Sequence, residues 1–224
     1  ECNNKGFSCL LNFIKNCTMD IEKIILKKDN EGNTPFDCTI RHRQEKKMKF
    51  ILDESAKLGI QQRVIMNENK RGQNTLHLSA MYDRNNEIFT CLLNFIKTDI
   101  VNMEKIILKT DDIGCTPFDL ILLHGQVNQI ESILEESAKL GIQEHVVMNE
   151  NKWGQNALHL STMNICKDGK FTCLLNFIKS NTTKIEQMLL KRDNNGCTPF
   201  DYTVKNGQVN KMNSILEESA KLGI

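Results

Sequence analysis

A glycine-centred turn returns at nearly constant spacing along this chain of 224 residues. The five turn glycines Gly32, Gly72, Gly114, Gly154 and Gly196 are separated by 40, 42, 40 and 42 residues, so the true period is a pair of units 82 residues long. Self-similarity at such a period is typical of a solenoid, in which each unit packs only on its neighbours. We therefore expect a row of like modules rather than one central core.

Two kinds of unit alternate after these glycines. The first, which we call the Leu-His type, carries Leu76-His77 and Leu158-His159. The second, the Phe-Asp type, carries a Thr-Pro-Phe-Asp run that begins at Thr34, Thr116 and Thr198. The pattern resembles the ankyrin repeat, whose signature is G-x-T-P-L-H-x-A-A, and the resemblance covers nearly all of the chain. It implies an all-α, ankyrin-type helix-turn-helix solenoid with a concave face that binds partners.

We expect a single array over residues 1–224, cut from a longer one, with units near 1–28 (partial), 29–68, 69–110, 111–150, 151–192 and 193–224. Thr34 suits the N-cap of the first helix, and Pro35 suits its first position. Each unit exceeds the standard length of about 33 residues. The surplus predicts either a longer second helix or an added short helix on the outer side.

Stacking should bury Leu76, Leu158, Phe118 and Phe200 in a continuous core. The histidines His77 and His159 suggest catalysis at first sight. The resemblance implies instead that they are structural and bond across the turns of adjoining units. No nucleophile–base pair or phosphate-binding glycine loop stands out, so we predict no catalytic residues and no enzymatic activity.

The charge balance and the cysteines exclude several classes of partner and site. With 29 basic and 28 acidic residues, the chain has no electrostatic reason to bind nucleic acid or an anionic membrane. There is also no apolar run long enough to span a bilayer. Several of the nine cysteines occupy equivalent repeat positions, too far apart for disulfides. Free, mostly buried thiols in a reducing cytoplasm are expected, with no metal site and no cofactor.

Differences between the copies collect at the turn tip before each glycine and at the end of each first helix. In the ankyrin family both zones project onto the concave face. An apolar stripe is expected there from Met81, Tyr82, Ile113, Leu123, Trp153 and Met163. Its polar rim should comprise Lys70, Arg71, Asp112 and Lys152. In the alternative interpretation, Trp153 folds back onto the neighbouring turn and merely packs.

These features predict a non-enzymatic protein–protein interaction module that holds a partner protein or peptide, and no small-molecule substrate. Arginine is rare (6 residues) beside 23 lysines, 25 asparagines and 23 isoleucines, a bias typical of AT-rich genomes. The chain is thus similar to ankyrin-rich effectors of intracellular bacteria, which bind host proteins in the host-cell cytosol. Two alternatives stay open: a substrate-recruiting arm of an enzyme or toxin whose catalytic domain lies elsewhere, and a structural spacer or self-assembling array.

Overall fold

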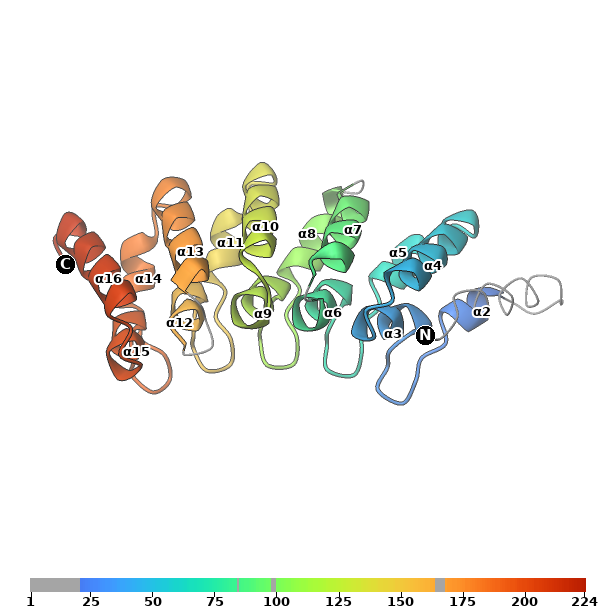
Figure 1. Ribbon diagram of the computed structural model, residues 1–224, viewed down its shortest axis with the longest axis horizontal. Coiled ribbons are helices and arrows are strands. Elements are labelled where there is room, and N and C mark those ends of the chain that lie inside the picture. Colours follow the sequence, from blue (N-terminus) through green and yellow to red (C-terminus); the bar gives the residue numbers. More distant parts are fainter. Residues whose placement is uncertain (1–20, 84, 98–99, 164–167) are drawn as a thin grey trace.

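A computed structural model describes residues 21–83, 85–97, 100–163 and 168–224. Across these ranges the chain is all helical, with 15 helices and no strand. The helices lie in a slightly arched row from α2 (Ile21–Ile25) to α16 (Val209–Leu222), as Figure 1 shows. Most of the partial unit predicted at 1–28 lies outside the described residues.

Three kinds of helix alternate along the row. The first helix of each unit follows the glycine turn: α3 (Pro35–Arg41), α6 (Thr75–Tyr82), α9 (Pro117–His124), α12 (Ala157–Ser161) and α15 (Pro199–Lys205). The second helix is longer: α4 (Glu45–Lys57), α7 (Glu87–Ile96), α10 (Val127–Lys139), α13 (Asp168–Asn181) and α16. The third is short: α2, α5 (Gln61–Ile65), α8 (Ile100–Leu108), α11 (Gln143–Met148) and α14 (Ile185–Leu190).

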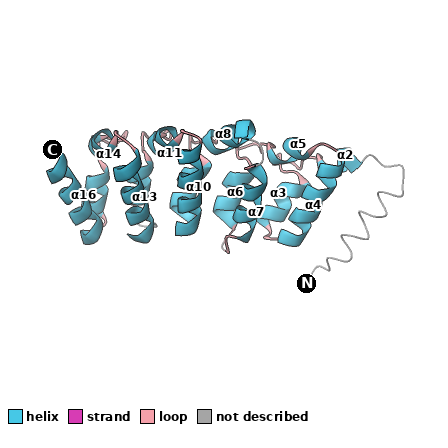
Figure 2. Cartoon of the chain, turned by 90° about the horizontal axis from the view of Figure 1, so that it is seen from above, coloured by secondary structure: helices cyan, strands magenta, loops and turns pink. Residues whose placement is uncertain are grey.

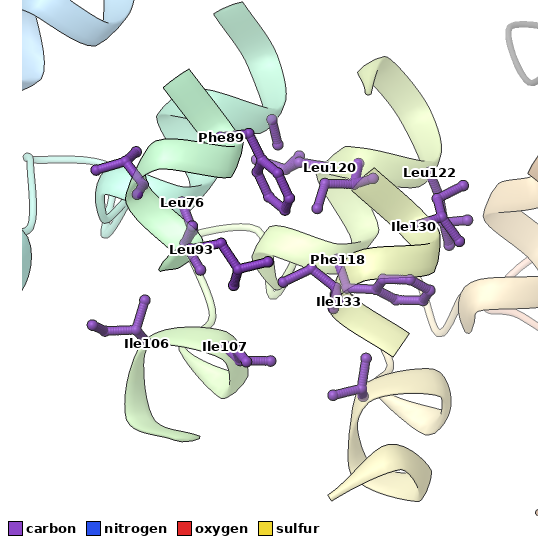
Figure 3. Close-up of a cluster of buried hydrophobic side chains, with 14 of the residues drawn as sticks. Leu76, Phe89, Leu93, Ile106, Ile107, Phe118, Leu120, Leu122, Ile130 and Ile133 are labelled. Carbon is purple, nitrogen blue, oxygen red and sulfur yellow. The ribbon is translucent and has the colours of Figure 1, made fainter. Parts of the chain in front are cut away.

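The surplus residues of each unit thus form an added helix, which was one of the two arrangements predicted. The third helices make a row of their own along one edge of the molecule (Figure 2). Ile106 and Ile107 of the α8 helix lie in the apolar core (Figure 3), where they are 3% and 0% exposed. Burial of this apolar face fixes the extra residues as a packed helix.

The start of each Phe-Asp-type helix is held by a capping box. Thr116 Oγ1 accepts a hydrogen bond from the Asp119 N–H at 3.3 Å, and Asp119 Oδ2 accepts one from the Thr116 N–H at 2.8 Å. Pro117 occupies the first turn, where its missing N–H costs nothing. The predicted N-cap at Thr34 is confirmed, with the same reciprocal bonds.

The Leu-His-type histidine joins one unit to the next. His77 Nε2 lies 3.0 Å from the carbonyl oxygen of Cys115, and His159 Nε2 lies 3.1 Å from that of Cys197. A carbonyl only accepts, so each Nε2 carries the proton and donates it. Burial lowers the pKa of His77 to about 4, which keeps the ring neutral. These contacts give the two histidines a structural role between adjoining units.

The apolar core is continuous along the row, from Ile25 to Ile215. Its central part joins Leu76 and Phe89 of one unit to Phe118 of the next (Figure 3). Of the predicted core residues, Leu76, Leu158 and Phe118 are fully buried. Phe200, which was also predicted to be a core residue, is only partly buried.

The cysteines of the described residues are free thiols. Cys115 and Cys197 are buried, whereas Cys38, Cys91 and Cys173 are partly exposed. Fewer of the thiols are therefore buried than predicted. Cys9 lies outside the described residues. Among the described helices, none is long and apolar enough to cross a membrane.

Candidate binding surface on the turn tips

Backbone hydrogen bonds join the five turn tips into one ladder. In each bond, the backbone N–H of one turn donates to the backbone carbonyl oxygen of the preceding turn. The four bonds run from Lys70 to Glu31 (2.8 Å), and from Asp112 to Arg71, Lys152 to Ile113 and Asn194 to Trp153 (2.9 Å each). The residue just before each glycine is therefore bonded to the residue that precedes its counterpart in the next unit. All five turns line the lower, inner edge of the arch in Figure 1.

Each turn is closed by an acidic or amide side chain two residues before the tip. In the central turn, Asp111 Oδ1 accepts from the N–H groups of Ile113 at 3.0 Å and Cys115 at 2.9 Å. Asn151 Oδ1 holds the Trp153 turn in the same way, at 3.0 and 3.1 Å. Backbone groups and these side chains therefore hold the turn in shape.

The tip side chains at the centre of the row project into solvent. Trp153 is 48% exposed and Ile113 is 39% exposed. The ladder sets Arg71, Ile113 and Trp153 in succession on three neighbouring turns. The charged neighbours Lys70, Asp112 and Lys152 are exposed as well. An exposed tryptophan beside an exposed isoleucine, rimmed by charges, has the composition of a protein-binding hot spot.

The first-helix ends are more deeply set than the tips. Met81, Tyr82, Leu123 and Met163 are all partly buried and pack against the apolar core. The predicted stripe is therefore not continuous. Its exposed apolar part comprises Ile113 and Trp153, and the other four residues form a half-buried shelf behind them.

Two arginines, neither of them among the predicted binding residues, flank Tyr82. The Arg41 guanidinium carbon lies 5.6 Å from the centre of the Tyr82 ring. Arg43 Nε donates to the Tyr82 carbonyl oxygen at 2.6 Å. Arg43 also has a positive φ of 56°, at a position where the other Phe-Asp-type units have Gly125 and Gly207. That exchange of glycine for arginine between copies is the signal that could have identified it.

A cavity of about 720 Å³ opens beside Leu123, lined also by His124, Gln126 and Lys170. Burial, and after it the charge of Lys170, lowers the pKa of His124. Lys170 donates to the Leu122 carbonyl oxygen at 2.9 Å, which secures the end of α9. The cavity offers space for a partner side chain next to the half-buried shelf.

No family model matches the chain, and no curated protein matches it in sequence. The fold is similar to that of a chain in the solved structure of a predatory endopeptidase from Bdellovibrio bacteriovorus in complex with an immunity protein. That match has a TM-score of 0.63 and 17% identity, and it covers 94% of this chain and 91% of the other. In all, 346 chains of solved structures match, so the fold is a common one and does not by itself define a function. Among the described residues, no group of three or more His, Cys, Asp or Glu side chains could hold a metal ion.

Proposed function

We propose that the chain is an ankyrin-type solenoid that binds a partner protein or peptide on its concave side, without catalysing a reaction. Trp153 is the central anchor, with Ile113 beside it and the half-buried shelf behind. The observation that carries this proposal is the 48% exposure of Trp153 on a turn that other groups hold in shape. A large exposed aromatic side chain on a turn that other groups hold, next to the exposed Ile113 turn, suits an anchor for a partner.

The surroundings of Trp153 support a protein ligand over a small molecule. The tips form an extended edge rather than a deep pocket, and Arg71, Lys152 and Asp112 provide charges of both signs around it. At the other end of the shelf, Arg41 and Arg43 surround Tyr82. A peptide with an apolar side chain for Trp153 and an acidic group for the arginines matches this arrangement.

The amino-acid composition supports a cellular location for this binding. The lysine, asparagine and isoleucine bias favours an effector of an intracellular bacterium that acts in the cytosol of its host. In the solved structure with the similar fold, an endopeptidase is in complex with an immunity protein, so a protein assembly contains this kind of fold. A host protein is accordingly the partner class to test first.

The proposal is tested by affinity capture from candidate host-cell lysate. The double variant Trp153→Ala, Tyr82→Ala should lose the captured partner while keeping the helical circular dichroism of the native chain. The exposed Trp153 should account for no more than about 1 kcal/mol of any loss in free energy of unfolding, and the half-buried Tyr82, which packs against the apolar core, should add a further loss of about 1 kcal/mol.

The matched control is Glu31→Ala, which truncates a tip side chain on the same ladder, two turns away from Ile113. Glu31→Ala should capture the partner as well as the native chain does. Equal capture by the Trp153, Tyr82 double variant would remove the site assignment. Capture lost together with helical content would show that the double variant had unfolded, and single substitutions at Trp153 would then decide.

A further inference from the structure

The ends of the five first helices carry a symmetric charge pattern. Equivalent positions there, 40 or 42 residues apart, follow the order cation, apolar, apolar, apolar, cation: Arg41, Met81, Leu123, Met163 and Lys205. Arg41 and Lys205 are exposed, whereas the three apolar residues are partly buried against the core. We call these five residues the first-helix row.

Side chains of the first-helix row contact the glycine turns. Gln73 directly follows the turn glycine of its unit, and its Nε2 lies 3.5 Å from the Met81 Sδ. Cys197 holds the equivalent place after Gly196, and its Sγ lies 2.7 Å from Lys205 Nζ. The row therefore borders the tip ladder and shares a face with Trp153.

Each cation of the row lies over a tyrosine ring. The Arg41 guanidinium carbon is 5.6 Å from the centre of the Tyr82 ring, and Lys205 Nζ is 5.6 Å from the centre of the Tyr202 ring. Tyr202 is held in turn by Gln155, whose Nε2 donates to the Tyr202 hydroxyl at 3.1 Å. A cation restrained on an aromatic face loses less side-chain freedom when a partner binds. Both cations are thus placed to receive an anionic group.

The two ends of the row keep their positive charge at neutral pH. Arginine stays protonated in proteins, and the contact with Cys197 raises the pKa of Lys205. In the middle of the same face, the exposed Asp112 precedes Ile113 on the central tip. An acidic group of a partner is therefore favoured at the ends of the row and disfavoured near Asp112.

The separation of the two cations sets the length of a ligand that reaches both. The helices α3, α6, α9, α12 and α15 pack side by side in chain order (Figure 1), so Arg41 and Lys205 are four helix steps apart. Packed helices lie about 8–10 Å apart, so four steps cover roughly 32–40 Å. An extended peptide covers about 3.3–3.6 Å per residue, so about 9–12 residues bridge the two cations.

We infer that the first-helix row binds an extended peptide segment with an acidic residue near each end, about 9–12 positions apart, and apolar side chains between them. One carboxylate pairs with Arg41 and the other with Lys205. The apolar side chains lie on the half-buried shelf and against Trp153, which Met81, Leu123 and Met163 permit because they follow one another in a single line. This inference rests on the proposed function and deepens it, because it gives the charge pattern and the length of the partner segment.

The test uses the full chain and two synthetic peptides with blocked ends. One has two glutamates about 11 positions apart, with leucines at its centre and serines elsewhere, and the other has the same composition with the glutamates about 5 positions apart. Isothermal titration calorimetry at low salt measures the Kd. Arg41→Gln and Lys205→Gln should each weaken binding of the long-spaced peptide about three-fold, and together about ten-fold. Lys205→Arg, which keeps the charge, should bind as the native chain does.

The matched control is Lys139→Gln, which removes an exposed cation from the second helix α10 and should leave the Kd unchanged. The short-spaced peptide should respond to at most one of the two cation variants. Equal weakening by Lys139→Gln, equal affinity of the two peptides, or no binding of the long-spaced peptide to the native chain would overturn the inference. The proposed function is decided separately, by whether Trp153→Ala loses the partner captured from lysate.

Discussion

At the scale of single residues, the capping-box aspartate of the Phe-Asp-type units has two different surroundings, at Asp119 and at Asp201. Asp119 is buried, accepts three hydrogen bonds on Oδ2 and leaves its buried Oδ1 without a partner. Its pKa is raised to about 7, with burial as the main cause. The pKa of Asp201 is lowered instead, because its Thr198 hydrogen bonds act without the same burial. The neighbouring unit, rather than the motif, decides how this carboxyl titrates.

Replacing Asp119 by asparagine should change how stability depends on pH. The folded pKa of about 7 exceeds the unfolded value of about 4, so between these pH values the folded chain keeps a proton that the unfolded chain has lost. The Asp119 carboxyl therefore makes the free energy of unfolding fall as pH rises through this window. Asp119→Asn should gain about 2 kcal/mol relative to the native chain between roughly pH 5 and pH 8.

Urea denaturation at several pH values measures this difference. Asp201→Asn is the matched control: the lowered Asp201 pKa contributes stability that is present above the unfolded pKa and lost only as pH falls below it. Its stability difference from the native chain should stay constant over the same range. Parallel pH curves for Asp119→Asn and the native chain would contradict the assigned titration.

The residue roles were only partly predictable. The histidines of the Leu-His type carry a structural role that the resemblance implied, and their contacts agree with it. The depth of Tyr82, Leu123 and Met163 was not predictable, because it depends on how adjoining helices pack and not on any local pattern. For the same reason, Arg41 and Arg43 entered the candidate surface only with the structure.

At the scale of elements, the turns show why glycine recurs. Gly114 has a φ of +77°, and a Cβ there would lie 3.0 Å from the Lys152 backbone nitrogen and 3.1 Å from Asn151 Cα. Gly196 has nearly the same φ, +75°, but a Cβ there would meet nothing within 4 Å. A substitution at Gly196 would therefore meet only backbone strain, whereas one at Gly114 would meet the same strain and a clash with the next turn.

Gly114→Ala should therefore destabilise the protein more than Gly196→Ala. Both substitutions carry the strain of a positive φ, about 1 kcal/mol. Only Gly114→Ala also pushes against the backbone of the next turn, which should add at least about 1 kcal/mol. Thermal unfolding followed by circular dichroism compares them, and equal melting temperatures would show that the ladder yields easily at this point.

The helix starts were predictable because capping chemistry is local, as Thr34, Pro35 and the turn glycines show. The third helix was left as one of two arrangements. Several extra residues per unit can either lengthen a helix or form a new one, and the choice is made by burial of Ile106 and Ile107 against other units. The choice between these two arrangements depends on tertiary packing, so the sequence of a single repeat cannot predict it.

At the scale of the whole molecule, consecutive second helices are also tied by charge. Lys97 pairs with Glu136 at 3.0 Å, and Lys179 pairs with Glu218 at 2.6 Å. The histidine bonds and the tip ladder likewise join each unit to the next one along the row. Stability in such an arrangement should be a sum over units and the junctions between neighbours.

Substitutions in different units should therefore affect the lone tryptophan differently. Phe118→Ala, next to the unit of Trp153, removes a fully buried ring and should cost about 3–5 kcal/mol. We expect it to lower the urea midpoint measured by Trp153 fluorescence. Phe36 is equally buried but lies two units further away. Phe36→Ala should therefore lower the urea midpoint of only part of the circular dichroism transition. If both substitutions lowered the fluorescence midpoint equally, the row would unfold as one cooperative block.

The repeat period made the line of turn tips predictable, since equal spacing brings equivalent residues side by side. The ladder that holds them uses main-chain N–H and C=O groups, which every non-proline residue possesses. Single substitutions can therefore accumulate without disturbing the ladder at the five tip positions, Glu31, Arg71, Ile113, Trp153 and Asn195. A lineage carrying this chain could change the protein it recognises by a few codon substitutions, and a protein engineer could randomise the same five positions to build a library of binders.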